Sequence, residues 1–221
     1  MGDFLLFLPV MSSSPNPSIL QHGKLLPLVE DFYTIQGEGF HSGTPAYFIR
    51  LGGCDMGCSW CDAKETWNPN LYPPCSIEEI ADRAASHPAK SVVITGGEPL
   101  LYPLAPLCDL LHRHGLRIFL ETSGSHPRSG VFDWICLSPK KQHPPREDIY
   151  AEASELKVIV FDASDLVWAE ENRRRVQPDC LLYLQPEWSG AARILPILVA
   201  YVKAHPLWRI SLQTHKYMQI P

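Results

Sequence analysis

Short apolar runs alternate with longer amphipathic stretches along most of this chain. The apolar runs are rich in Val, Ile, Leu and Phe, which is typical of strands that are buried on both faces. They predict strands over residues 46–51, 91–95, 117–121, 134–137, 156–160, 181–185 and 209–213. The stretches between them predict helices over residues 77–87, 104–114, 165–175 and 191–204. This alternation favours a parallel sheet with right-handed crossovers.

Two of the expected helices carry end signals. Ser76 and Glu79 form a capping box in front of the helix at 77–87. Gly115 follows the helix at 104–114, in the position of a glycine C-cap. The chain holds roughly six strand–helix units, which are too few for a closed eight-fold barrel. We therefore predict an α/β fold, a partial (βα)6-type barrel with a parallel sheet in which some helices are reduced.

The domain organisation is simple, because 221 residues suit one domain. Residues 12–18 are rich in Ser, Pro and Asn, a composition typical of flexible chain. The apolar patch at residues 4–8 is short and follows Asp3, so it does not predict a signal peptide. We expect a flexible N-terminal extension over residues 1–25 and a core domain over residues 26–221. No apolar run is long enough to span a bilayer, so we expect no membrane association.

Charge and cysteine content narrow the function further. The net charge is −5 and the longest basic run is residues 173–175, so nucleic acid is not an expected partner. That run ends the helix expected at 165–175, where cations suit the negative end of the helix dipole. The chain has seven cysteines, an odd number that does not suit a secreted disulfide framework. We expect reduced thiols and a cytoplasmic location.

Three of the cysteines, Cys54, Cys58 and Cys61, lie on a loop after the first predicted strand. Thiolates at this spacing can wrap one [4Fe–4S] cluster from a single loop. Three protein ligands leave one iron open, where S-adenosylmethionine can bind and be cleaved to a radical. The alternative is a structural zinc loop completed by Cys75 or a distant His. Such loops favour a second Cys-x-x-Cys or a His pair at ligand spacing, and the sequence has neither.

A second loop, Thr95-Gly96-Gly97-Glu98-Pro99, follows the next predicted strand. Its two glycines allow the backbone to come close to a ligand. Backbone carbonyls and Glu98 are candidates to receive the ammonium group of S-adenosylmethionine. Taken alone, the same pattern also fits a strand-ending turn. Parallel strands bring the loops at their carboxyl ends to one edge of the sheet, so we expect this loop beside the cysteines.

At these residues the chain resembles the radical S-adenosylmethionine superfamily, and within it the 7-carboxy-7-deazaguanine synthase family. The resemblance runs from about residue 28 to residue 221. It rests on an ordered set of segments, because a Gln-Gly-Glu-Gly segment also occurs in related activating enzymes. The segments are Phe32-Tyr33-Thr34-Ile35-Gln36-Gly37-Glu38-Gly39, Phe48-Ile49-Arg50-Leu51, Trp60-Cys61-Asp62-Ala63-Lys64-Glu65-Thr66-Trp67, Glu121-Thr122-Ser123-Gly124, Ser138-Pro139-Lys140, Gln185-Pro186, and Gln213-Thr214-His215-Lys216-Tyr217 with Pro221.

The resemblance implies a lyase that converts 6-carboxy-5,6,7,8-tetrahydropterin into 7-carboxy-7-deazaguanine with loss of ammonia, on the route to queuosine or another 7-deazapurine. S-adenosylmethionine is then regenerated, a flavodoxin or ferredoxin supplies the electron, and the enzyme is a homodimer. The implied substrate contacts are Ile35, Gln36, Gly37, Arg50, Thr95, His215 and Pro221. The implied cofactor contacts are Gly97, Glu98, Ser138, Pro139, Lys140, Gln185, Pro186, Glu187 and Trp188.

Physical chemistry supports four of the substrate contacts, each with an alternative. Arg50 offers a planar donor fork to a carboxylate, or forms a surface ion pair. Gln36 has a donor and an acceptor that suit a pterin edge, or belongs to a plain turn. The α-carboxylate of Pro221 can accept two hydrogen bonds from the guanidine-like edge of a pterin, or lies at a frayed terminus. His215 reaches the same pocket or caps the final strand.

One position departs from the family pattern. Many members carry a Thr or Ser two residues after the third cysteine, where its hydroxyl binds Mg²⁺. This chain has Ala63 there, which has no side-chain oxygen. Magnesium prefers oxygen ligands and tolerates several waters, so Asp62 or water are the candidates to replace the hydroxyl. An equally good interpretation is that Asp62 caps the turn after the cysteine loop. We predict weaker stimulation by Mg²⁺ than in Thr-bearing relatives.

Two other functions remain open from the sequence. One is a different radical enzyme, such as an activase that abstracts hydrogen from a protein glycine and needs an open groove for its partner. The other is a non-catalytic iron–sulfur or zinc protein. The four remaining cysteines are isolated and are expected to be small buried apolar residues. They are Cys75, Cys108, Cys136 and Cys180.

Overall fold

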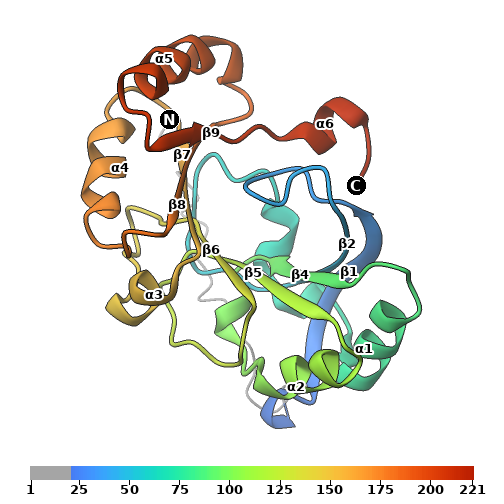
Figure 1. The fold of residues 1–221 in the computed structure, drawn as a ribbon. Helices are drawn as coiled ribbons and strands as arrows, with labels where there is room; N and C mark the ends of the chain where they lie inside the picture. Colours follow the sequence, from blue (N-terminus) through green and yellow to red (C-terminus); the bar gives the residue numbers. More distant parts are fainter. Residues whose placement is uncertain (1–20) are drawn as a thin grey trace, which may run out of the picture.

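A computed structural model describes residues 21–221. These residues form one nine-stranded sheet in the order β3-β1-β2-β4-β5-β6-β7-β8-β9 (Figure 1). At one edge, β1 (Leu25–Ile35) pairs antiparallel with both β3 (Pro74–Ser76) and β2 (Pro45–Leu51). From β2 onward all neighbouring strands are parallel. The outermost strands β3 and β9 lie at opposite ends of this order, so the barrel is open, as predicted.

The predicted parallel strands are confirmed. Beyond β2 they are β4 (Ser91–Gly96), β5 (Arg117–Thr122), β6 (Trp134–Leu137), β7 (Glu155–Val160), β8 (Leu181–Pro186) and β9 (Trp208–Ile210). Only the last differs from its prediction by more than one residue at an end, since it stops before Ser211. The chain turns away there because Ser211 Oγ donates to Gln185 Oε1 at 2.7 Å and Gln213 Nε2 donates to Glu38 Oε1 at 2.9 Å.

Strand β1 was not predicted from the sequence. It lies beside the edge of the sheet, its side chains are mostly half-buried, and the charged Glu30 and Asp31 interrupt its apolar positions. The pairing with β2 also shifts register between Leu28 and Glu30. A bulge of this kind breaks the alternation by which a strand is recognised.

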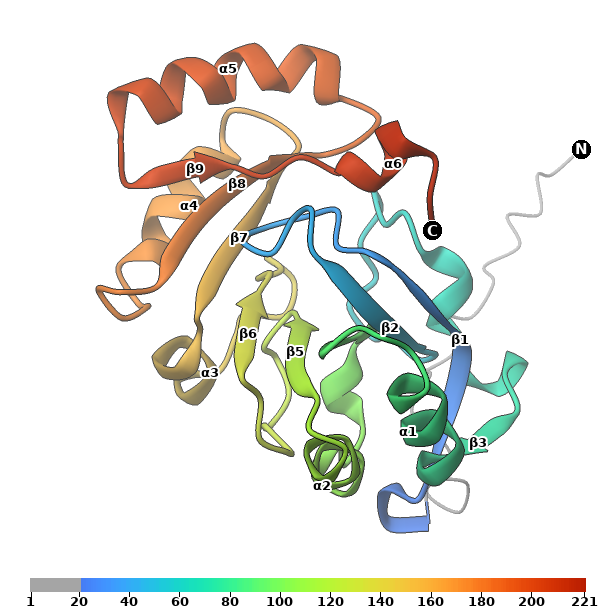
Figure 2. The same ribbon diagram turned by 45° about the vertical axis from the view of Figure 1, so that its right-hand side comes forward.

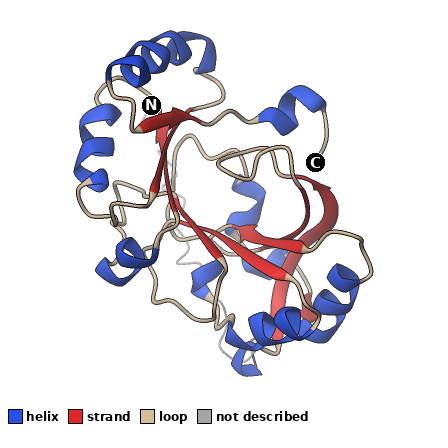
Figure 3. Cartoon of the chain, viewed as in Figure 1, coloured by secondary structure: helices blue, strands red, loops and turns tan. Residues whose placement is uncertain are grey.

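All four predicted helices are present. They are α1 (Ile77–Ala85), α2 (Ala105–Arg113), α4 (Asp165–Arg173) and α5 (Ala191–Ala204). Two short helices, α3 (Glu147–Glu152) and α6 (Thr214–Met218), were not predicted (Figure 3). Four 3₁₀ turns complete the described elements: η1 (Gln21–Gly23), η2 (Lys64–Trp67), η3 (Pro69–Leu71) and η4 (Pro99–Leu101). Within the described chain β6 follows β5 without a helix, which confirms the reduced helices.

The sheet is curved, with helices outside it and the C-terminus over its open side. Helices α1 to α5 lie around the convex face, and α6 lies over the concave face (Figures 1 and 2). Apolar side chains between strands and outer helices form the main core, for example Ile94, Leu120, Ile80 and Leu107. The concave side instead holds the polar side chains that form the pocket described below.

The two predicted helix ends have the expected hydrogen bonds. Ser76 Oγ accepts from the Glu79 amide at 3.2 Å, and Leu116 N donates to Leu111 O at 3.1 Å across Gly115, whose φ is 72°. The expected N-terminal extension lies outside the described residues up to residue 20, while residues 21–23 form η1 and Leu25 begins β1. None of the helices among residues 21–221 is long and apolar enough to cross a membrane.

Candidate active site

The carboxyl ends of the parallel strands surround one cavity of about 410 Å³. Of the predicted site residues, all of which lie in the described part of the chain, Pro139 alone is not part of its lining. The cavity thus brings together the three cysteines, both sets of predicted contacts and the Asp62–Ala63 pair. It also contains residues that were not predicted: Glu30, Glu38, Glu121, Lys157, Gln213 and Lys216.

The cysteine loop is held in place by backbone contacts on both sides. Gly53 N donates to Thr66 O at 2.6 Å, Cys54 N donates to Trp67 O at 3.2 Å, and the hydroxyl of Tyr102 donates to Gly52 O. Gly53 has a φ of 102°, and a side chain there would collide with that same hydroxyl, at 2.3 Å. Only glycine therefore fits this turn, which presents the following thiol to the cavity.

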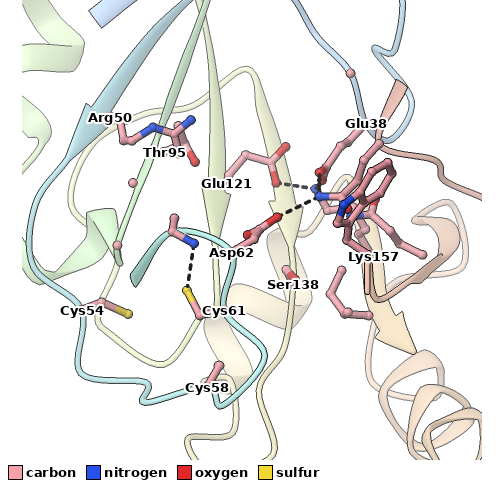
Figure 4. A pocket seen from close by; sticks show the side chains of 18 of the residues that line it. Glu38, Arg50, Cys54, Cys58, Cys61, Asp62, Thr95, Glu121, Ser138 and Lys157 are labelled. Atoms are coloured by element: carbon pink, nitrogen blue, oxygen red, sulfur yellow. Dashed lines mark hydrogen bonds and ion pairs between the residues drawn. The ribbon is translucent and has the colours of Figure 1, made fainter. Parts of the chain in front are cut away.

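The three thiols suit a cluster better than a single ion. Cys54, Cys58 and Cys61 line one cavity, and Figure 4 shows them spread along one side of it. Within residues 21–221 no three His, Cys, Asp or Glu side chains lie close enough together to share one metal ion. Burial raises the pKa of Cys54 to about 12, so without metal this thiol keeps its proton. In a [4Fe–4S] cube each cysteine binds a different iron, which matches this spread.

The Gly-Gly-Glu-Pro loop lies beside the cysteines, as predicted, but Glu98 is already bonded to the protein. Its buried carboxylate accepts from the Leu100 amide, from Thr122 Oγ1, and from both the amide and the hydroxyl of Ser123, at 2.6–3.0 Å. Four donors occupy the acceptor positions of a carboxylate. These bonds give Glu98 a positioning role that ties this loop to the end of β5. Glu98 also lines the cavity, and its contact with a ligand ammonium stays a prediction.

Ser138 and Lys140 form a cationic part of the wall next to the cluster loop. Lys140 Nζ donates to both Ser138 O and Ser138 Oγ at 2.7 Å, and lies 5.5 Å from the ring centre of Trp60. Burial lowers the pKa of Lys140, while the neighbouring Cys58 opposes that shift. A cation here lies within reach of an anionic ligand bound at the cysteines.

The segment Gln185–Trp188 forms the adjoining wall. Glu187 accepts from the amides of Ser189 and Gly190 at 2.9 Å, so its carboxylate is used to hold the start of α5. Trp188 is partly exposed, and the ring of Tyr217 on α6 packs against it edge-on, with ring centres 5.6 Å apart. This wall is thus built jointly by the loop after β8 and the C-terminal helix.

The opposite wall carries the predicted substrate contacts. Arg50 on β2 is paired in register with Thr95 on β4, and Figure 4 shows the two side chains next to each other. Arg50 Nε donates to Glu30 at 2.7 Å, so the ion pair considered as its alternative exists, but within the cavity lining. Gln36 is buried and accepts from the Glu38 amide at 3.2 Å. Both side chains thus line the cavity while being held by a protein partner.

Residues of α6 and the following Pro221 close this wall. His215 lies on α6 directly against Gly37, where a side chain would meet its ring at 2.2 Å, so His215 reaches the pocket and does not cap β9. Burial lowers the pKa of His215, and the nearby Lys216 lowers it further. Pro221 lines the cavity, and Thr34 Oγ1 donates to its backbone oxygen O at 3.4 Å.

A charged cluster that was not predicted lies at the cavity floor (Figure 4). Lys157 Nζ is bonded to Glu38 at 2.7 Å and to Glu121 at 2.9 Å, and only 5% of its side chain is exposed. Lys157 lies on a predicted strand that is otherwise apolar, and Glu121 ends one whose three middle residues are apolar. A charged residue on a doubly buried strand must face a partner or a polar cavity, so the sequence held a usable signal for this cluster.

The fold and the cysteine loop together define a radical S-adenosylmethionine protein, and a family model described as the Radical SAM superfamily matches residues 48–159. A 7-carboxy-7-deazaguanine synthase of Flavobacterium psychrophilum is 50% identical over 91% of this chain and 96% of its own length. That of Escherichia coli is 35% identical over 88% of this chain and 98% of its own. The chain belongs to the 7-carboxy-7-deazaguanine synthase family.

A solved structure agrees with this membership. The crystal structure of QueE from Escherichia coli superposes with a TM-score of 0.76 at 31% sequence identity, and covers 90% of this chain and 98% of that one. The predicted fold class, a partial radical S-adenosylmethionine barrel, is thereby confirmed. Members of the superfamily carry a [4Fe–4S] cluster and S-adenosylmethionine, and the three thiols and their glycine-lined loop fit these groups.

Proposed function

We propose that this protein converts 6-carboxy-5,6,7,8-tetrahydropterin into 7-carboxy-7-deazaguanine and ammonia, which makes it a carbon–nitrogen lyase of 7-deazapurine biosynthesis. The main support is that one cavity has the three-cysteine loop on one side and, on the other, polar side chains that can bind a pterin. The substrate contains the same atoms and the same number of electrons as 7-carboxy-7-deazaguanine and ammonia together. The reaction therefore needs no oxidant, and S-adenosylmethionine is regenerated.

Cys54, Cys58 and Cys61 would hold three irons of the cluster. Lys140 with Ser138 would bind the carboxylate of S-adenosylmethionine, since an ammonium and a hydroxyl are good partners for an anion. When bound, the cluster and S-adenosylmethionine together supply a 5′-deoxyadenosyl radical. Gly97 lets the backbone of the second loop approach that ligand, and the wall from Gln185 to Trp188 covers it.

On the facing wall, Arg50 would bind the substrate carboxylate with its guanidinium fork. Gln36 offers a donor and an acceptor to the pterin edge. The α-carboxylate of Pro221 would accept the guanidine-like edge of the same ring. His215, whose pKa is lowered by burial, is neutral near pH 7 and can either donate or accept. Ile35, Gly37 and Thr95 complete the surface against which the pterin lies.

The size of the cavity distinguishes this function from that of an activase. A cavity of about 410 Å³ suits a small molecule, whereas a protein glycine must enter through a groove that accepts a partner chain. The reductant (a flavodoxin or ferredoxin) and the homodimer stay predictions from the resemblance, and the cytoplasmic location stays a prediction from the cysteine content.

Anaerobic reconstitution tests the proposal. The protein should bind about four irons per chain. With dithionite, S-adenosylmethionine and the carboxytetrahydropterin, it should release 7-carboxy-7-deazaguanine and one equivalent of ammonia, measured by mass spectrometry and an ammonia assay. Deoxyadenosine production without any deazaguanine would indicate a radical enzyme with another substrate.

Matched cysteine variants locate the cluster. Cys54→Ala, Cys58→Ala and Cys61→Ala should each lose the iron and the product. Cys75→Ala removes a partly buried thiol outside the cavity lining and should keep both. Equal iron content in Cys58→Ala and Cys75→Ala would contradict the assignment.

A further inference from the structure

Lys216 on α6 connects two loops of the active site. Its Nζ donates to Asp62 Oδ2 at 2.8 Å and to Gln213 Oε1 at 3.1 Å, and lies 4.7 Å from the ring centre of Trp188. Asp62 directly follows the last cysteine of the cluster loop, and Trp188 belongs to the loop after β8. The C-terminal helix therefore places a fixed cation where the cluster loop meets the cavity.

The residues at this place do not fit Mg²⁺. Ala63 has no side-chain oxygen, and its backbone oxygen already accepts from the Thr66 amide at 3.0 Å and the Thr66 hydroxyl at 2.7 Å. Asp62 Oδ2 accepts from both Lys216 and Gln213. Magnesium needs a near-octahedral set of oxygen ligands, and an ammonium on the same carboxylate oxygen repels a dication.

We propose that Lys216, in place of a divalent cation, supplies the positive charge that binds the substrate carboxylate, and that the enzyme does not need Mg²⁺. The inference rests on the proposed function. An ammonium has three N–H groups. Asp62 and Gln213 accept hydrogen bonds from two of them, so among the described residues the third N–H remains for a ligand. Contact with the Trp188 ring restricts the side chain, so little further ordering is needed when the ligand binds.

Arg50 and Lys216 act together in this arrangement. Both line the cavity that His215 also lines. In addition to burial, both charges act to lower the pKa of His215, against Glu38 and Asp62, which act to raise it. Each is held by a carboxylate partner, Glu30 or Asp62. A substrate carboxylate between them would receive a donor from each side, which is how a charge-assisted pair gains strength and orientation.

The test measures binding without turnover. The iron-loaded protein, with S-adenosylmethionine and no reductant, is titrated anaerobically by calorimetry with 6-carboxytetrahydropterin and with 6-methyltetrahydropterin, in EDTA and in Mg²⁺. For the wild type we expect the dissociation constant of the carboxypterin in EDTA to agree with that in Mg²⁺ within about twofold. Lys216→Met should weaken carboxypterin binding about tenfold or more and leave the methylpterin unchanged, because a charge-assisted hydrogen bond is lost.

Three further variants make the result specific. Lys216→Arg keeps the charge and should retain tight binding, while Lys203→Met removes an exposed lysine of α5 and should match the wild type. Adding Ala63→Thr to Lys216→Met supplies a hydroxyl and should restore binding only in Mg²⁺. Iron content and melting temperature of each variant verify that it is folded and loaded.

Several outcomes overturn the inference. One is wild-type binding that weakens about tenfold in EDTA, which would show that a metal carries the charge. Another is Lys216→Met binding the carboxypterin as the wild type does. A third is an equal loss for both pterins, which would indicate a structural role. Wild-type protein that binds neither pterin would instead refute the proposed function, and this inference with it.

Discussion

Gly97 lies directly against the backbone of Gly53. A methyl group on Gly97 would stand 2.0 Å from the Gly53 carbonyl oxygen and 2.8 Å from Cβ of Cys54. The neighbouring Glu98 amide donates to that same carbonyl at 2.8 Å. The loops after β2 and β4 are therefore packed backbone to backbone, and the position of the first cluster thiol depends on this contact.

Gly97→Ala should impair cluster assembly. The added methyl collides with a backbone atom that no side-chain rotation can relieve, so the Cys54 loop must move. We expect reconstituted iron to fall below about half of the four atoms of a full cluster. Gly190→Ala is the matched control, since its methyl would meet other atoms at 3.4 Å or more. Full iron loading of Gly97→Ala would show that the loop is more pliable than this packing implies.

Most of the sheet was predictable because each parallel strand is a compact apolar run. The cysteine loop and the Gly97 loop were found by their spacing and their place after strands. Sequence periodicity missed α6, because its five residues span little more than one turn and none is buried. The sequence also did not predict that Glu98 ties two loops together, since a carboxylate that binds a ligand and one that binds backbone and hydroxyl groups look alike in the sequence.

The buried cation Lys157 holds two carboxylates, and its removal should destabilise the protein. Lys157→Met leaves Glu38 and Glu121 without their partner in a site where only 5% of the lysine side chain is exposed. Breaking a buried pair in this way costs about 3–5 kcal/mol of folding free energy. Urea denaturation measures it, with the exposed Lys203→Met as control. A loss as small as that of the control would mean that water reaches both carboxylates.

Glu38 should make stability depend on pH. Burial alone would raise the pKa of Glu38, but the charge and hydrogen bond of Lys157, with bonds from Gln213 and Gln185, hold it below its ordinary value of 4.5. As the pH falls, the unfolded chain therefore binds this proton at a higher pH than the folded protein does. The stabilisation is present above pH 4.5 and is lost as the pH falls toward the lowered pKa.

Urea denaturation as a function of pH tests this sign. From about pH 5 downward, the wild type should lose free energy of unfolding more steeply than Glu38→Gln, which has no proton to take up there. At pH 7 the variant should be the less stable of the two. Glu171→Gln, which changes an exposed carboxylate of α4, serves as control and should follow the wild type. Parallel curves for Glu38→Gln and the wild type would contradict the assignment.

The last residue should matter through its carboxylate. Pro221 lines the cavity and is held by Thr34, and the chain reaches it by a left-handed turn at Gln219, whose φ is 56°. A peptide tag on Pro221 converts the α-carboxylate into an amide and removes a charged acceptor for the pterin. We expect KM for the carboxytetrahydropterin to rise about tenfold, which is the scale of one charge-assisted hydrogen bond.

Iron content and reductive cleavage of S-adenosylmethionine should not change in the tagged enzyme, because the cysteines lie on the other wall. The same tag at the N-terminus is the control for bulk and handling. Deletion of Pro221 keeps a carboxylate but withdraws it by one residue, and should raise KM as the tag does. If the C-terminal tag leaves KM unchanged while the deletion raises it, the pocket needs the proline ring and not the charge of the α-carboxylate.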